Sequence, residues 1–203
     1  MQLSLWAGEK AEVGGGWSRV RHIELGDGAW LEYAPTFVSG HEALMERLAS
    51  GMAWKQERRV MYEREVDVPR LVCGASNDET LDPVLRETAG LLATRYGATF
   101  RQVGLAYYRD GRDSVAWHRD KMPRDRDTLV CILSLGAPRK LMLRPFGGGR
   151  SRTFVIGQGD LLVMGGSCQL RWEHCVPKTK HAAPRISCMF RHVYDDRVYV
   201  AAD

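Results

Sequence analysis

Hydrophobic side chains in the first half of the chain recur three or four positions apart, the spacing that gathers them on one face of a helix. The run Ser39-Gly40-His41-Glu42 precedes one such set and has the form of a capping box, with Ser39 as N-cap. A second helix is predicted to start near Asp82-Pro83 and to end at Gly97. The apolar positions are Leu44, Met45, Leu48 and Met52 in the first helix and Leu85, Leu92 and Tyr96 in the second.

After Gly97 the pattern changes to short β-rich runs separated by glycine-containing turns. Evenly spaced short strands of this kind favour a sandwich or a double-sheet jelly roll. We therefore predict a mainly β fold with N-terminal helices, in one domain over residues 1–203, with the helices in 1–99 and the jelly-roll core in 100–203. Strands are expected near 102–108, 114–119, 128–134, 139–145, 152–156, 160–164, 168–174 and 185–192.

Composition fits this picture, because 203 residues that are 44% hydrophobic suffice for one compact domain. No apolar run approaches the roughly 20 residues of a spanning helix, and the first residues lack the features of a signal peptide, so no membrane association is expected. The five cysteines are odd in number and scattered, which is typical of reduced thiols in a cytoplasmic protein.

The net charge of +4 is mild, but basic residues gather in one segment. No acid falls between Gly136 and Gly159, so the segment either attracts phosphates or forms an ordinary solvated face. Its basic residues are Arg139, Lys140, Arg144, Arg150 and Arg152.

A His-x-Asp pair, His118 and Asp120, stands at the end of a predicted strand, where alternation places both side chains on one face. Such a pair supplies two of the three ligands of a 2-His-1-carboxylate iron site. His174 is the candidate third ligand, because a distant jelly-roll strand can return beside the first, although it could also be a core histidine. A zinc site with Cys168 and Cys175 fits no usual ligand spacing.

The run from Arg185 to Arg191 reads as one strand, with Arg185, Ser187, Met189 and Arg191 on a common face. Two arginines on an inner face are costly unless paired with anions, and a guanidinium binds carboxylate through two hydrogen bonds. A dicarboxylate ligand is one such anion; the alternative is one exposed arginine and one that pairs with an Asp or Glu.

The order His-x-Asp, His, Arg-x5-Arg resembles the AlkB family of Fe(II)- and 2-oxoglutarate-dependent dioxygenases, in a short form of bacterial appearance. The resemblance covers about residues 30–192. Flanking runs that match the family are Val68–Arg70, Tyr108–His118, Leu133–Arg139, Gly159–Gly166 and Pro184–Ser187.

This resemblance implies a jelly roll, or double-stranded β-helix, with a nucleotide-recognition lid, and oxidative dealkylation of bases in DNA or RNA. The reaction would use Fe(II) as cofactor, consume 2-oxoglutarate and O2, and release formaldehyde, succinate and CO2. A monomer is expected. The implied Fe(II) ligands are His118, Asp120 and His174, and the implied 2-oxoglutarate contacts are Tyr108, Arg185, Ser187 and Arg191.

The chain departs from the family pattern at three positions. The family usually has Asn at the position of Ala106 and often has Asn at the position of Ser187. These differences predict weaker binding of 2-oxoglutarate, by about 0.5–1.5 kcal/mol per lost hydrogen bond. Met122 follows the metal motif where many relatives have an acid, so base preference is open.

Damaged bases must be flipped out of a duplex or presented from a single strand to reach such a site. The lid, expected between Trp54 and Arg70, would contact them, although its nearly balanced charges also fit a solvated hairpin. Trp172 would either line the pocket or fill the barrel. The candidate substrate contacts are Trp54, Met61, Tyr62, Arg70, Met122 and Trp172. Two rival functions remain, a catalytically weak nucleic-acid-binding module and a dioxygenase acting on a protein or small molecule.

Overall fold

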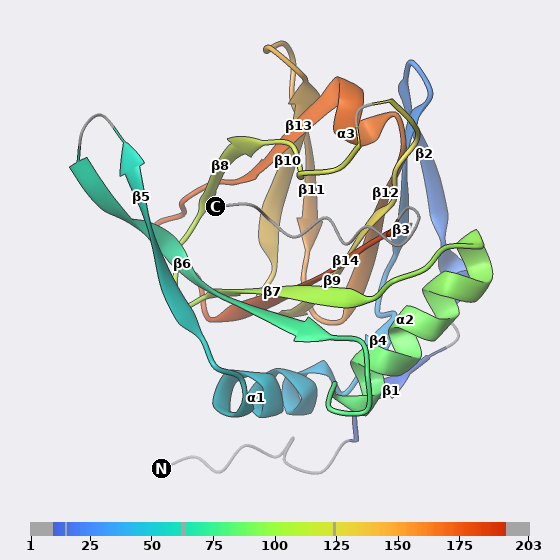
Figure 1. Ribbon diagram of the computed structural model, residues 1–203, viewed down its shortest axis with the longest axis vertical. Helices are drawn as coiled ribbons and strands as arrows, with labels where there is room; N and C mark the ends of the chain where they lie inside the picture. Colours follow the sequence, from blue (N-terminus) through green and yellow to red (C-terminus); the bar gives the residue numbers. More distant parts are fainter. Residues whose placement is uncertain (1–9, 15, 62–63, 124, 194–203) are drawn as a thin grey trace.

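The structure, a computed structural model, describes residues 10–14, 16–61, 64–123 and 125–193 (Figure 1). Its helices are η1 (Gly16–Arg19), α1 (His41–Gly51), α2 (Pro83–Tyr96) and α3 (Cys168–Arg171). Its strands are β1 (Glu12–Val13), β2 (Arg21–Gly26), β3 (Ala29–Ala34), β4 (Val38–Ser39), β5 (Lys55–Met61), β6 (Arg64–Ser76), β7 (Gln102–Tyr108), β8 (Val115–His118), β9 (Val130–Gly136), β10 (Arg139–Pro145), β11 (Arg152–Ile156), β12 (Asp160–Gly166), β13 (Trp172–Val176) and β14 (Arg185–Arg191).

Two antiparallel sheets build the molecule and confirm the mainly β fold. The larger has the order β2-β3-β12-β9-β14-β7-β6-β5 and the smaller the order β11-β10-β13-β8, with a separate β1-β4 pair. Buried side chains of both sheets form one core, with Ile132 and Leu162 from the larger sheet and Leu141 and Leu143 from the smaller. This inner core lies between the sheets, as expected for a jelly roll.

Helices α1 and α2 cover the opposite face of the larger sheet (Figure 1). Their apolar faces, with Leu44, Leu48, Leu85 and Leu92, join a second core with sheet residues such as Phe190. Successive residues of β14 therefore serve different cores, because strand side chains alternate between the two faces of a sheet.

Helix α2 begins and ends where its sequence predicted. The Asp82 side chain accepts a hydrogen bond from the backbone N–H of Val84 at 3.0 Å, and Gly97 ends the helix in the left-handed conformation. The prediction that Ser39 caps α1 is wrong. Gly40 is the N-cap, in the left-handed conformation at φ 57°, and the Ser39 hydroxyl instead donates to Glu12 at 3.4 Å.

Seven of the eight expected core strands are present, with shifts of one or two residues at their ends. The strand expected at 168–174 is wrong in its first half, because residues Cys168–Arg171 form α3 before β13 starts at Trp172. Hydrogen bonds from the N–H groups of Leu170 and Arg171 to the carbonyl of Ser167 close this turn. Within the described ranges, no helix is both long and apolar enough to cross a membrane.

Candidate metal and cosubstrate site

The three predicted metal ligands lie together on the smaller sheet. Strands β8 and β13 are neighbours, and His118 stands opposite His174 in their register. The two imidazole rings are 4.3 Å apart between centroids. Asp120 follows two residues after the end of β8, and its Oδ2 lies 3.7 Å from Nε2 of His174. Residues 54 positions apart thus meet through strand pairing.

Hydrogen bonds position His118 and Asp120. Nδ1 of His118 lies 2.9 Å from the carbonyl oxygen of Ala116, which assigns the proton to Nδ1 and leaves Nε2 for a metal. The backbone N–H of Asp120 donates to Oε1 of Gln169 at 2.8 Å. Oδ1 of Asp120 accepts from Nη2 of Arg191 at 2.6 Å, so Gln169 holds the backbone of Asp120 and Arg191 holds its carboxylate.

Electrostatics set the protonation states that metal binding requires. Burial acts to raise the pKa of Asp120, but Arg191 and the two histidines outweigh it and hold that pKa well below its usual range. Burial, reinforced by His118 and opposed by Asp120, lowers the pKa of His174 to about 3. At neutral pH the pair is therefore a carboxylate beside a neutral imidazole.

Across the described residues, no three His, Cys, Asp or Glu side chains already stand in a closed metal-binding arrangement. His118, Asp120 and His174 instead lie side by side, the histidines on two neighbouring strands and Asp120 just after one of them. The register of β8 and β13 fixes which residues share the site. Two imidazoles and one carboxylate fit Fe(II).

Arg185 lies at the start of β14 and is 1% exposed. Its Nη2 donates to Oγ of Ser134 at 2.8 Å, whereas Nε and Nη1 are buried without a hydrogen-bond partner. A buried guanidinium with unmet donors is costly unless an anion completes it. The two open donors fit the carboxylate that the sequence resemblance implied for this residue.

The other predicted cosubstrate contacts surround Arg185. Tyr108 stands opposite it in the register, with its ring centroid 5.1 Å from the guanidinium carbon. Ser187 is buried and stands opposite Ala106 on one side and Ser134 on the other. Small side chains therefore lie beside Arg185 on the inner face of β14, to which Arg191 also belongs.

Arg139 is a second buried arginine, and sequence reasoning assigned it to an exposed basic segment. It is 3% exposed and donates to the carbonyl groups of Asp110, Asp113 and Pro177 at 3.1, 2.9 and 2.8 Å. Its guanidinium carbon lies 5.7 Å from the Tyr108 ring. Arg139 thus joins the two loops that follow β7 and precede β14. The alternation Arg139, Leu141, Leu143 along β10 was the signal for burial.

The candidate substrate contacts separate into two groups. Met122 is buried in the inner core, Trp172 packs against that core, and Arg70 donates to the carbonyl of Ser114 at 3.4 Å. These three remain candidates. The side chain of Met61, and Tyr62 as a whole, lie outside the described residues.

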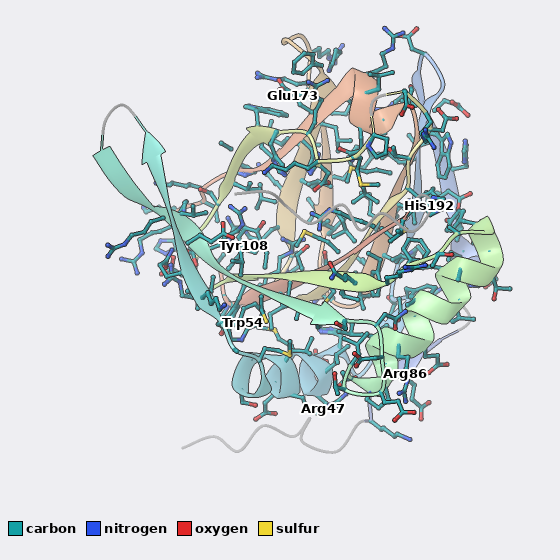
Figure 2. The ribbon with its side chains drawn as sticks, in the orientation of Figure 1. Arg47, Trp54, Arg86, Tyr108, Glu173 and His192 are labelled. Carbon is teal, nitrogen blue, oxygen red and sulfur yellow. The ribbon has the colours of Figure 1, made fainter. Side chains whose placement is uncertain are left out.

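Trp54 does not belong with the site. Its indole N–H donates to the carbonyls of Leu48 and Ala49 at the end of α1, and its ring packs 5.3 Å from Tyr107 in the helix-side core. In Figure 2 it lies near α1, whereas Tyr108 lies at the inner face. Trp54 therefore packs in the helix-side core and is not positioned to stack on a base.

The sequence profile of the 2OG-Fe(II) oxygenase superfamily matches residues 72–198. This span includes every metal and cosubstrate residue just described. The chain belongs to the 2OG-Fe(II) oxygenase superfamily. Its cofactor and cosubstrates are accordingly Fe(II), 2-oxoglutarate and O2, which the triad and Arg185 are suited to bind.

Similar proteins support the AlkB resemblance of this oxygenase. Human alpha-ketoglutarate-dependent dioxygenase alkB homolog 3 is 31% identical over 187 residues, which cover 80% of this chain and 65% of that protein. Bovine DNA oxidative demethylase ALKBH2 is 29% identical over 121 residues, covering 55% and 44% of the two chains. The chain therefore spans less than two thirds of the length of either relative.

A solved structure, that of OsALKBH1, shares the fold of this oxygenase with a TM-score of 0.58 at 12% identity. The superposition covers 85% of this chain and 100% of the other. At that identity the likeness concerns the fold alone, and it agrees with the two-sheet arrangement described above.

Proposed function

We propose that this oxygenase removes alkyl groups from N-alkylated bases, such as 1-methyladenine and 3-methylcytosine, in DNA or RNA. The observation that carries the chemistry is the buried Arg185, whose Nε and Nη1 lack partners in the barrel that holds the His118–Asp120–His174 triad. The nucleic-acid substrate is supported by the relatives, one of which bears the name DNA oxidative demethylase.

The protein's own residues position the reactants. Arg185 and Tyr108 would take the distal carboxylate of 2-oxoglutarate, and Arg191 keeps Asp120 ionised and turned toward the site. Bound Fe(II), with 2-oxoglutarate and O2, supplies hydroxylation of the N-alkyl carbon, after which formaldehyde leaves. His174 and Asp120 are buried, 5% and 6% exposed, which limits access of water.

A flipped or single-stranded base would enter beside the β5–β6 hairpin. These strands extend from the edge of the larger sheet (Figure 1). The backbone N–H of Ser114 donates to the carbonyl of Pro69 at 2.7 Å, so β6 is tied to the segment that leads into His118. This contact supports a role of the hairpin as the lid.

The test is mass spectrometry of single-stranded DNA and RNA that carry 1-methyladenine or 3-methylcytosine. We expect conversion to the unmethylated base only when Fe(II), 2-oxoglutarate and O2 are all present, and none with His174→Ala. Affinity for the strands without any succinate in a single turnover would favour the binding-module alternative. Succinate formation with an unrelated substrate, and no salt-dependent affinity for nucleic acid, would favour a different substrate class.

We also propose that the protein works as a cytoplasmic monomer. None of its five cysteines, all of which are described, forms a disulfide, as is typical of a reducing compartment. Sedimentation of the purified protein tests the monomer, and a dimer at assay concentration would contradict it.

A further inference from the structure

Large hydrophobic side chains that face solvent are rare among the described residues. They are Phe146, 56% exposed, and Val155, 57% exposed. Phe146 directly follows β10 and precedes three glycines, and its backbone N–H donates to the carbonyl of Arg171 at 2.8 Å. The aromatic ring is thus fixed at its backbone beside the end of α3, although its side chain is exposed.

Arg119 covers one face of this ring. Its guanidinium carbon lies 3.5 Å from the ring centroid of Phe146, and its Nη1 donates to the carbonyl of Leu170 at 3.1 Å. A guanidinium over an aromatic face is attracted by the ring quadrupole. The pair is therefore held in place at both members, and the exposed area of Phe146 remains available for a second planar partner.

The position of Arg119 links this pair to the metal site. Arg119 is the residue between the ligands His118 and Asp120, so it shares their backbone but points away from the barrel interior. Any strand of nucleic acid that delivers a base to the triad must continue past the rim of the site. The Arg119–Phe146 pair lies on the outer side of the segment whose inner side carries the two ligands.

The surrounding charge is positive. A second cation–π pair, Arg144 over Trp117 at 4.1 Å, lies on the same outer face of the smaller sheet. Glu173 is the acid that β13 contributes there, and Arg144 neutralises it through a 2.6 Å ion pair. The exposed basic residues on adjoining segments are Lys121, Arg150 and Arg171.

We propose that the Arg119–Phe146 pair is a stacking platform for the nucleotide next to the target base in a single strand. The inference rests on the proposed function and adds a site to it. A base would stack on the face of Phe146 opposite Arg119. The neighbouring cations would attract the phosphates of the strand. Every base presents a planar face, so this contact adds affinity without sequence preference.

The test compares Phe146→Ala with Val155→Ala by fluorescence anisotropy, using an unmodified single-stranded oligonucleotide as the probe. Val155 is the matched control, because it is equally exposed but belongs to β11, at the opposite edge of the smaller sheet from β8. We expect Phe146→Ala to weaken binding about 5- to 150-fold, the range for loss of one stacked base. Val155→Ala should bind the oligonucleotide as the wild type does. Phe146→Tyr, which keeps an aromatic ring, should retain the wild-type affinity.

A methylated mononucleotide separates stacking from damage to the fold, since it has no flanking base. We expect Phe146→Ala to bind it as tightly as the wild type does. Equal oligonucleotide affinity in Phe146→Ala and the wild type would overturn the platform while leaving the proposed function intact. A wild type without any salt-dependent affinity for oligonucleotides would instead overturn the proposed function itself.

Discussion

Replacement of Arg185 by Met should have two effects of opposite sign. The native guanidinium is 1% exposed and interacts with Ser134 and Tyr108, while Nε and Nη1 have no hydrogen-bond partner in the barrel. Burial acts to lower the pKa of Arg185, and nearby Arg139 adds to this. Arg185 therefore lowers the stability of the ligand-free protein, and a bound carboxylate would offset this loss.

The loss of ligand binding follows from the two open donors. A hydrogen bond to a charged group contributes about 1.5–3 kcal/mol, so two such bonds to the cosubstrate carboxylate amount to about 3–6 kcal/mol. Because 1.4 kcal/mol is a factor of ten, Arg185→Met should raise the 2-oxoglutarate concentration needed for half-maximal succinate formation by about 10²- to 10⁴-fold.

The free protein should not lose stability. Substitution of a buried charge by an apolar side chain of similar size is often neutral or stabilising, by about 1–4 kcal/mol. Arg185→Met without ligand should therefore melt at the same temperature as the wild type or above it. The rise in melting temperature that 2-oxoglutarate and metal give the wild type should shrink in the variant.

Thermal unfolding with and without 2-oxoglutarate, under anaerobic conditions, measures both effects. Arg139→Met is the matched control, since Arg139 is as deeply buried but already donates to three carbonyl groups. That variant should melt below the wild type even without ligand, because three buried carbonyls lose their donor. Wild-type 2-oxoglutarate affinity in Arg185→Met, or a clear loss of stability in its free form, would refute the reasoning.

Three further results are expected. His118→Ala, Asp120→Ala and His174→Ala should each abolish iron-dependent turnover with an unchanged circular dichroism spectrum, and full activity in any of them would remove that residue from the triad. Because the pKa of His174 is depressed, the unfolded chain binds more protons than the native one between pH about 3 and 6.5. The free energy of unfolding of the metal-free protein should therefore fall by up to about 2 kcal/mol as the pH drops from 6.5 to 5. Denaturant titration should show a weaker dependence of this free energy on pH in His174→Asn. Ser187→Ala should raise the 2-oxoglutarate requirement about 2- to 10-fold in a succinate assay, and an unchanged requirement would show that its hydroxyl makes no contact.

Much of the fold follows from local chemistry in the sequence. Helix α2 obeys the Asp82-Pro83 start and the Gly97 stop because both signals act through the backbone of the helix itself. Most strands of the core were also predicted, since alternation and glycine turns mark them. The order of the strands within each sheet was not, because pairing depends on contacts between distant segments.

The errors arise where tertiary contacts decide. Ser39 has a cap's chemistry but lies in a strand paired with β1, so Gly40 takes its place. Four residues, Cys168–Arg171, are too few for periodicity to distinguish a helical turn from a strand. That turn carries Gln169, whose side chain accepts a hydrogen bond from the backbone N–H of Asp120. Gln169 is thus a positioning residue that no sequence motif indicated.

The site itself was predicted through the order of its motifs rather than from single residues. His174 alone reads as a core histidine, and only its placement opposite His118 gives it a ligand's environment. Arg139 was missed because its charge was counted with the exposed basic residues of its segment, while its burial depends on the loops that fold over it.

The most direct test of the account is the simultaneous measurement of formaldehyde and succinate from a single strand carrying 1-methyladenine or 3-methylcytosine. With Fe(II), 2-oxoglutarate and O2, we expect equal amounts of the two products, and neither product when Fe(II) or 2-oxoglutarate is omitted. Succinate without formaldehyde, on DNA and RNA strands alike, would contradict dealkylation of bases and would assign the oxygenase another substrate.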